Sequence, residues 1–297
     1  MRAFVLYYPA VRRRLPSQLV TVTVFLLTGA PAWAWGCRGH QIVALIAAAH
    51  LQPAVAARVR QILAIPASPE ARRPCRGSVS LPPLARVAGW ADAVRTASTD
   101  PFHFVNLPLD ARRGHVDYAA ICQSDCISAV LNRYLAQLRA PATSPRQRAV
   151  ALRYVIHLVG DAFQPLHVSD NADRGGNCVR TRLPRVRRRS DLHADWDSQI
   201  LNRMMRSQGP AAYARRLEQR FGRRYAAGSL RPLDWIWSSH AVAVGTAYGP
   251  LHLAPGCHAR TLRLRPAYVR GAEAAIAVQL DRAGWRLAAV LNQELAR

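Results

Sequence analysis

The chain has 297 residues, of which 50% are hydrophobic and 20% are charged. This balance excludes a disordered or collagen-like chain, and the length is sufficient for a buried core. All 41 basic residues are arginines against 17 acidic residues, so the formal net charge is +24. A surface with this excess is expected to attract polyanions.

The first 34 residues have the three parts of a secretory signal peptide. Arg12–Arg14 form a basic segment, Leu19–Leu27 form an apolar run, and Ala32-Trp33-Ala34 is a cleavage site. A membrane anchor is the alternative, but the run is shorter than the ~20 residues that span a bilayer. The sequence therefore predicts a signal peptide over residues 1–34, export to the periplasm or the medium, and no stable membrane association after cleavage.

Apolar residues at spacings of three and four predict helices along most of the remaining chain. In chain order these helices are Gln41–Leu51, Ala54–Ile65, Ile127–Leu138, Arg146–Phe163, Tyr213–Phe221 and Ala272–Leu295. The segment Asn177–Leu183 alternates briefly and is a candidate strand. No internal repeat or low-complexity linker separates these segments. We therefore expect a mainly α fold, with residues 35–297 forming one domain.

Six cysteines in an exported chain are expected to form disulfide bonds. Six cysteines allow 15 pairings. Only Cys122 and Cys126 are close enough in sequence for their pairing to be predicted, as a small loop just before a helix. Pairing of Cys37 with Cys75 and of Cys178 with Cys257 is a guess that the sequence alone leaves open.

Histidine and aspartate recur at a spacing that suits a metal site. His157 and Asp161 are four residues apart on a predicted helix, so they project from one face, and Pro165 is expected to turn His167 back toward them. His193 and Asp197 repeat the spacing. One such pair alone would more simply be an ordinary helix pair. Two pairs beside apolar helix faces favour a metal, because buried polar groups without partners are costly, and this donor set suits Zn²⁺ better than Mn²⁺ or Fe²⁺.

Further motifs extend this pattern over the chain. The blocks are WGCRGH, GWADAVR, FHFVN, VDYAAICQSDCISAV, LRYVIHLVGDAFQPLH, GGN, DLHADWD and AGWRLAAVLN. With these blocks the chain resembles the secreted, zinc-dependent, single-strand-specific nucleases and 3'-nucleotidases of fungi, plants and bacteria. This family shares a helical fold with zinc phospholipase C. The resemblance implies a single helical domain with three zinc ions in one cleft.

The resemblance also implies a ligand for each zinc ion. The implied sets are Asp92, His103, His157 and Asp161 for the first ion; Asp161, His40 and the α-amino group and carbonyl of Trp35 for the second; and His167, His193 and Asp197 for the third. The amine of Trp35 exists only after cleavage behind Ala34, so zinc assembly would depend on export.

The remaining implied roles concern catalysis and substrate. Asp92 would orient the attacking water and Arg95 would neutralise charge in the transition state. Phe104 would stack on a nucleobase, while Asn106, which stands where the fungal enzymes carry an acid, and Asn177 would also contact substrate. The implied activity is hydrolysis of single-stranded DNA and RNA to 5'-phosphorylated products, together with hydrolysis of 3'-nucleotides.

Two other functions remain open at this stage. A secreted zinc phospholipase C shares the fold, although its last ligand is typically Glu where this chain has Asp197. An exported basic protein that binds polyanions without cutting them is the second alternative. The segment Val179–Ser190, with six arginines in twelve residues, is either a solvated loop or a steering element for polyanions.

Overall fold

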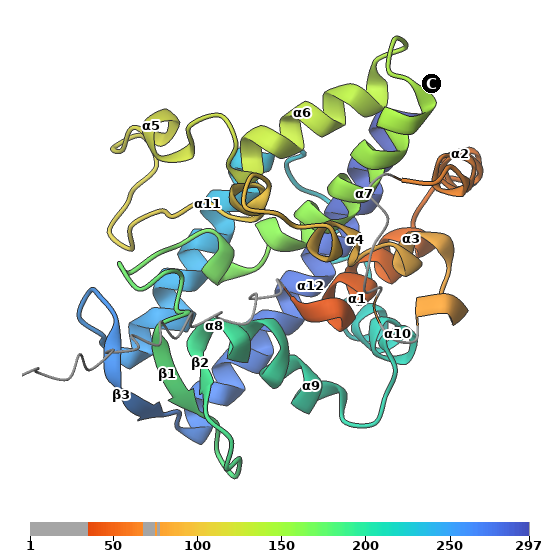
Figure 1. Cartoon of the computed structure of the whole chain (residues 1–297). Coiled ribbons are helices and arrows are strands. Elements are labelled where there is room, and N and C mark those ends of the chain that lie inside the picture. Colours follow the sequence, from red (N-terminus) through yellow and green to blue (C-terminus); the bar gives the residue numbers. More distant parts are fainter. Residues whose placement is uncertain (1–34, 68–74, 76–77, 297) are drawn as a thin grey trace, which may run out of the picture. The chain divides into compact units, whose positions relative to one another are not determined.

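The computed structural model describes residues 35–67, 75 and 78–296, so the predicted signal peptide lies outside the described residues. The helices are α1 (Gly36–Ala49), α2 (Pro53–Ala64), α3 (Pro83–Arg86), α4 (Trp90–Ala93), α5 (Tyr118–Cys122), α6 (Ile127–Arg139), α7 (Pro145–Ala162), α8 (Leu192–Ala194), α9 (Ile200–Met205), α10 (Pro210–Phe221), α11 (Pro232–Val242) and α12 (Pro266–Leu295). The short 3-10 and π segments are η1 (Ser78–Ser80), η2 (Asp100–His103), η3 (Pro165–His167), η4 (Asp195–Gln199), η5 (Ala243–Tyr248) and η6 (Gly249–Leu251). The strands are β1 (Val179–Arg182), β2 (Ser190–Asp191) and β3 (His258–Arg263) (Figure 1). The prediction of a mainly α fold is confirmed.

All six predicted helices are present, and most begin earlier than their apolar pattern does. The long helix α12 starts at Pro266 rather than at Ala272, because proline is well suited to the first helical position. Helix α7 begins with a capping box in which Ser144 and Gln147 satisfy each other's backbone groups. Local signals thus set the helix starts, while the apolar pattern marks the stretch that packs.

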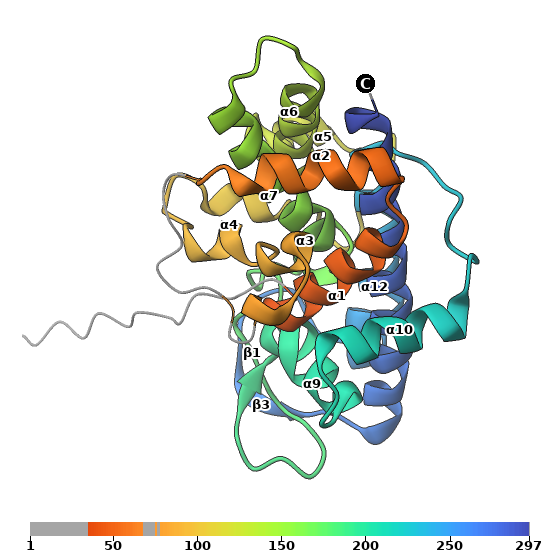
Figure 2. The ribbon, with the colours of Figure 1, turned by 90° about the vertical axis from the view of Figure 1, so that its right-hand side faces the viewer.

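Helices α1, α7 and α12 build the core. Helix α1 packs along α12 and also contacts α7 and α10, while α6 packs against α7 (Figures 1 and 2). Every residue of α7 from Ala151 to Ala162 is buried. The polar side chains of this stretch, among them His157 and Asp161, are therefore buried.

A small sheet adjoins this core in the strand order β2-β1-β3. Strands β1 and β2 are antiparallel, with Arg180 opposite Asp191, and β1 pairs in parallel with β3, with Thr181 opposite Leu262. Strand β1 lies within the segment predicted as a strand, whereas β3 was not predicted. The sheet matters for function because β2 leads directly into α8, which carries His193.

All six cysteines are paired, as Cys37–Cys75, Cys122–Cys126 and Cys178–Cys257. The local pairing predicted for Cys122 and Cys126 is confirmed, and both guessed pairings also occur. Among the described residues, no helix combines the length and the apolar character that crossing a membrane requires.

Candidate metal centre and active site

Five residues from four elements meet around Asp161, four of them buried and Asp92 half-buried; we call them the first cluster. They are His40 of α1, Asp92 of α4, His103 of η2, and His157 and Asp161 of α7. One oxygen of Asp161, Oδ1, lies 3.2 Å from His40 Nε2, and the other, Oδ2, lies 3.0 Å from His103 Nδ1 and 3.3 Å from His157 Nε2. His157 Nε2 is also 3.4 Å from Asp92 Oδ1. Asp161 is therefore placed to bridge two sets of ligands.

Three residues that follow the first cluster in sequence form the second cluster. They are His167 of η3, His193 of α8 and Asp197 of η4, and all three are buried. His193 Nε2 lies 3.2 Å from Asp197 Oδ2, and the Nε2 atoms of His167 and His193 are 3.1 Å apart. The backbone of His167 accepts a hydrogen bond from Val105, which joins this cluster to the segment behind His103.

Backbone carbonyls fix the orientation of three of these imidazoles. The Nδ1 atoms of His157, His167 and His193 donate to the carbonyl oxygens of Ala88, His103 and Gly175, at 2.8, 2.7 and 2.7 Å. Each Nε2 atom then carries the lone pair and faces its cluster, as in metal sites whose ligands are oriented by outer partners. The two Nε2 lone pairs of the second cluster would repel each other at 3.1 Å unless a cation or a proton lies between them.

The buried atoms of both clusters also make too few hydrogen bonds for a site without a metal. Within the described part of the chain, His103 Nε2, Asp92 Oδ1, Asp161 Oδ1 and Asp197 Oδ2 make no hydrogen bond. Such atoms are costly to bury unless another partner compensates them. Three groups of residues each bring their ligand atoms within 4.8 Å of one another. The groups are His40, Asp92 and His157; His103, His157 and Asp161; and His167, His193 and Asp197. Imidazole and carboxylate donors at these distances fit zinc.

The pKa values show how strongly these carboxylates attract positive charge. Burial alone would lower the pKa of His157, but Asp161 and Asp92 outweigh it and raise that pKa well above its usual value. Burial would raise the pKa of Asp161, but the charge of His157 and hydrogen bonds hold it well below the usual range. In the second cluster Asp197 raises the pKa of His193 to about 9 against the effect of burial, whereas burial lowers the pKa of His167 to about 4. Asp161 is therefore ionised inside the core.

Trp35, the expected first residue of the mature chain, is fully buried beside both clusters. Its indole Nε1 donates to the carbonyl of Gly160 on α7 at 2.8 Å, and its backbone nitrogen donates to Asp197 Oδ1 at 3.3 Å. The indole thus anchors the residue on α7 and directs its backbone nitrogen toward the ligands.

Other residues support the clusters and were not singled out from the sequence. A Cβ atom on Gly160 would lie 2.7 Å from His40 Nδ1, so glycine at this position leaves room for the imidazole. Gly175 has a φ of +61°, and a Cβ atom there would lie 2.7 Å from a backbone oxygen. Gln164 donates from Nε2 to Asp197 Oδ1 and orients that carboxylate. The quoted blocks LRYVIHLVGDAFQPLH and GGN contain all three, but nothing in their pattern reveals these contacts.

The expected catalytic pair lies at the edge of the first cluster. Asp92 belongs to α4, and Arg95 follows this helix with its Nη1 atom 3.9 Å from Asp92 Oδ1. Arg95 Nε also donates to Asp100 Oδ1 at 2.7 Å, a partner that the spacing of Asp92 and Arg95 does not predict. The guanidinium is thereby held beside the cluster by two carboxylates.

The residues expected at the substrate are less enclosed. Phe104 directly follows His103 and is half-buried, and Asn106 is exposed. Asn177 is half-buried, and its side-chain amide donates to the backbone carbonyl of Arg174 at 2.8 Å. The structure therefore brings the nine expected ligands together, while the substrate residues lie in the segments that border them.

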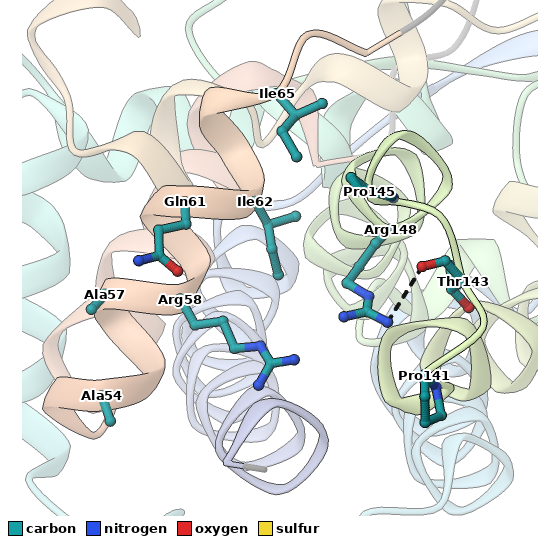
Figure 3. A pocket seen from close by; sticks show the side chains of 10 residues that line it. All are labelled: Ala54, Ala57, Arg58, Gln61, Ile62, Ile65, Pro141, Thr143, Pro145 and Arg148. Atoms are coloured by element: carbon teal, nitrogen blue, oxygen red, sulfur yellow. Dashed lines mark hydrogen bonds between the residues drawn. The ribbon is translucent and has the colours of Figure 1, made fainter.

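A cavity of about 760 Å³ lies apart from these residues, between α2 and the loop that joins α6 to α7 (Figure 3). Arg58 and Arg148 direct their guanidinium groups into it, and Ile62 and Ile65 also line it. Arg148 also donates to the carbonyl of Ala140 at 2.6 Å. None of the expected site residues lines this cavity, so it is separate from the candidate metal centre.

The fold and the clusters together define a mainly α protein in which several groups of His and Asp residues could hold metal ions. Sequence comparison narrows this class. The sequence pattern of the family described as S1/P1 nuclease matches residues 35–296. The chain belongs to this family, and its fold is the mainly α type that the family shares with zinc phospholipase C.

Individual relatives cover the chain to different extents. The chain is 27% identical to Nuclease P1 of Penicillium citrinum over 286 residues, which are 87% of this chain and 97% of that protein. It is 32% identical to Endonuclease 2 of Arabidopsis thaliana over 197 residues, or 62% of each chain. It is 30% identical to Nuclease S1 of Aspergillus oryzae over 195 residues, or 63% of this chain and 60% of that protein. The last two matches thus span about three-fifths of the relative's length.

Proposed function

We propose that residues 35–297 are an exported, zinc-dependent nuclease that cleaves single-stranded DNA and RNA to 5'-phosphorylated products and also hydrolyses 3'-nucleotides. The main support is the convergence of buried His and Asp ligand atoms in a chain of a nuclease family. The proposed ligands are Asp92, His103, His157 and Asp161 for one zinc ion; Asp161, His40 and Trp35 for a second; and His167, His193 and Asp197 for a third.

The protein residues would divide the chemistry between them. Zinc, when bound, supplies Lewis-acid activation of water and of the phosphoryl group. Asp92 would hold the attacking water in line and accept its proton, because its carboxylate faces both the first cluster and Arg95. Arg95 would donate to the phosphoryl oxygens as negative charge develops on them.

Substrate selection would depend on the residues next to the ligands. Phe104 would stack on a nucleobase, which requires a base that is not paired in a duplex and so favours single strands. Asn106 and Asn177 would contact the nucleotide through amides that both donate and accept hydrogen bonds. The arginine excess, including Val179–Ser190, would draw polyanionic substrates to the surface.

The signal peptide would control activity through Trp35. Cleavage after Ala34 would free the α-amino group of a residue whose backbone nitrogen already lies beside Asp197. Protein that retains residues 1–34, or that carries an added methionine before Trp35, should lose activity by orders of magnitude while it keeps its helical circular dichroism. Full activity of an uncleaved precursor would exclude the amine as a ligand.

The direct test is the turnover of five substrates, four nucleic acids or nucleotides and one phospholipid, by the processed protein before and after chelation. Single-stranded DNA, single-stranded RNA and 3'-AMP should be hydrolysed, duplex DNA should be cut far more slowly, and chelation should abolish each activity. Lecithin serves as the fifth substrate. Release of phosphocholine without release of nucleotides would instead identify a phospholipase C.

A further inference from the structure

One face of α7 extends from the first cluster toward the beginning of the helix. Gln147, Val150, Tyr154 and His157 are spaced three, four and three residues apart, so their side chains project from the same face. At 1.5 Å per residue this face runs for about 15 Å from His157 to Gln147. Residues that pack on this face of α7 therefore lie between the candidate metal centre and a point about 15 Å from it.

An aromatic cluster with a guanidinium group occupies the middle of this face. The ring of Tyr154 stacks on Tyr134 of α6 with centroids 4.7 Å apart, and it meets Phe102 edge-on at 5.9 Å. The guanidinium carbon of Arg133 lies 5.2 Å from the centroid of Phe102 and 5.4 Å from that of Tyr134. Phe102 immediately precedes the expected ligand His103. The cluster is therefore one residue away from the metal centre.

Arg133 carries a charge that no carboxylate of the described residues neutralises. Among the described residues, no carboxylate lies within 4.0 Å of its guanidinium group, whereas Arg95 nearby is held by Asp92 and Asp100. Arg133 is exposed, while Phe102 and Tyr134 are half-buried. The guanidinium group lies against both rings and interacts with the Tyr134 side chain, and because Arg133 is exposed part of the group faces solvent; guanidinium groups stack on bases and bind phosphates.

A cavity of about 570 Å³ continues the face beyond the aromatic cluster. It is lined by Gln137, Ser144, Arg146, Gln147 and Val150. Gln137 follows Tyr134 by one helical turn on α6, and Val150 precedes Tyr154 by one turn on α7, so the cavity adjoins the stacked tyrosines. Its lining contains an arginine, two amides and no acid. Like Arg133, it suits a polar, negatively charged ligand.

We propose that these residues form an extended binding strip for the substrate strand, beyond the nucleotide held at the metal centre. The α6–α7 strip consists of Phe102, Arg133, Tyr134, Gln137, Arg146 and Gln147. Arg133 contacts a backbone phosphate, and an adjacent base stacks on the exposed face of its guanidinium group. The occupant is single-stranded nucleic acid, because the strip combines uncompensated arginines with stacking surfaces and starts at the proposed catalytic site. This proposal rests on the proposed nuclease function.

The cavity in Figure 3 is also lined by arginines but does not belong to this strip. Arg148 is nine residues from His157, which is two and a half turns and places the two residues on opposite faces of α7. Arg58, on α2, lines that cavity and is not among the residues that line the cavity of the strip. Arg58→Ala therefore removes the same charge as Arg133→Ala and serves as its matched control.

The test compares a single-stranded oligonucleotide of about ten residues with a 3'-mononucleotide as substrates. Arg133→Ala should lower kcat/KM for the oligonucleotide roughly tenfold, mainly through KM, and leave hydrolysis of the mononucleotide unchanged. It should also reduce the slope of log affinity against log salt by about 0.7, the value for one phosphate contact on a single strand. Arg133→Lys keeps the charge but loses the planar stack, so it should raise KM without changing the salt slope. Arg58→Ala should match the wild type.

Equal losses for Arg133→Ala and Arg58→Ala, equal losses on both substrates, or no loss on the oligonucleotide would each overturn the strip. Binding of a phosphorothioate oligonucleotide to the zinc-loaded protein, measured by fluorescence anisotropy, separates the two proposals. If the wild type binds this strand and Arg133→Ala weakens binding, the strip stands even if no cleavage is observed. Cleavage without any effect of Arg133→Ala leaves the nuclease function intact and refutes the strip alone.

Discussion

Asp161 and Asp281 are both fully buried aspartates, yet their surroundings differ: within the described chain Asp161 Oδ1 and both oxygens of Asp281 make no hydrogen bond, whereas Asp161 Oδ2 is hydrogen-bonded to His103. Three imidazoles lie within 3.3 Å of Asp161, and its pKa lies well below the usual range. Asp281, on α12, has no such neighbours, and burial together with the charge of Glu218 raises its pKa to about 7. The converging donor atoms thus place the ionised Asp161 so that it could act as a metal ligand, whereas the isolated Asp281 keeps its proton to a higher pH.

The largest predicted effect comes from removing the charge of Asp161, which tests whether this carboxylate acts as a metal ligand. Asp161→Asn should lower turnover by about 10³-fold or more and remove up to two zinc ions, because two proposed sites share this carboxylate. Zinc analysis and turnover of single-stranded DNA check both effects. Asp234→Asn is the control, since Asp234 lies away from both clusters and pairs with Arg113 and Ser229 near the surface. Equal turnover in the two variants would contradict the role of Asp161.

A second pair of variants separates metal binding from catalysis at the edge of the first cluster. Asp92→Asn should reduce turnover by roughly 10²–10⁴-fold, the range for a positioned acid–base group, and remove at most one zinc ion. Arg95→Ala should reduce turnover by about 10²–10³-fold and leave the zinc content unchanged, as expected for one transition-state stabiliser. Near-normal turnover of Asp92→Asn with its full zinc content would transfer the role of catalytic carboxylate to Asp161 or Asp197.

These predictions show which parts of the site could be foreseen. The spacing of His157 and Asp161, repeated in His193 and Asp197, predicts paired ligands because four residues make about one helical turn. The contacts that orient them could not be predicted. They depend on carbonyls such as that of Ala88, which is 69 residues away from His157 in sequence, and on the absence of a side chain at Gly160.

The fold shows the same limit. Helix α11 escaped the apolar pattern because Ser239 and His240 occupy positions on its buried face, where they bond to Ala162 and Ser169. Strand β3 pairs with β1 across a long connection, and its exposed residues give no alternating apolar signal. Polar groups on buried faces and pairing between distant segments are therefore where sequence patterns fail.

The smallest predicted effect concerns Asp281, the other buried aspartate of the comparison, and the way its ionisation affects stability. The folded-state pKa of Asp281, about 7, lies above the reference value of 3.8, so the folded state retains a proton that the unfolded state loses. The contribution of Asp281 to stability is thus largest below pH 4 and is lost as pH rises toward 7. Asp281→Asn should stabilise the protein at pH 8 by about 1–3 kcal/mol, or several degrees in Tm, and change little at pH 4. Thermal melts of both proteins at the two pH values provide the measurement.

Asp234→Asn again supplies the contrast, because hydrogen bonding from Ser229 and the charge of Arg113 lower the pKa of Asp234. Its replacement should leave Tm unchanged or slightly lower at pH 8, the opposite sign to Asp281→Asn. A lower Tm for Asp281→Asn at pH 8 would show that the buried carboxylate has a stabilising partner.

The central claim, that the buried His and Asp clusters are a zinc centre, is tested most directly by counting metal ions. Protein processed to begin at Trp35 should be exchanged into metal-free buffer after loading with zinc and then measured by elemental analysis. We expect three zinc ions per chain, and a Tm that falls on chelation because ions bound only by the folded state stabilise it. One ion or none, with an unchanged Tm after chelation, would contradict this claim.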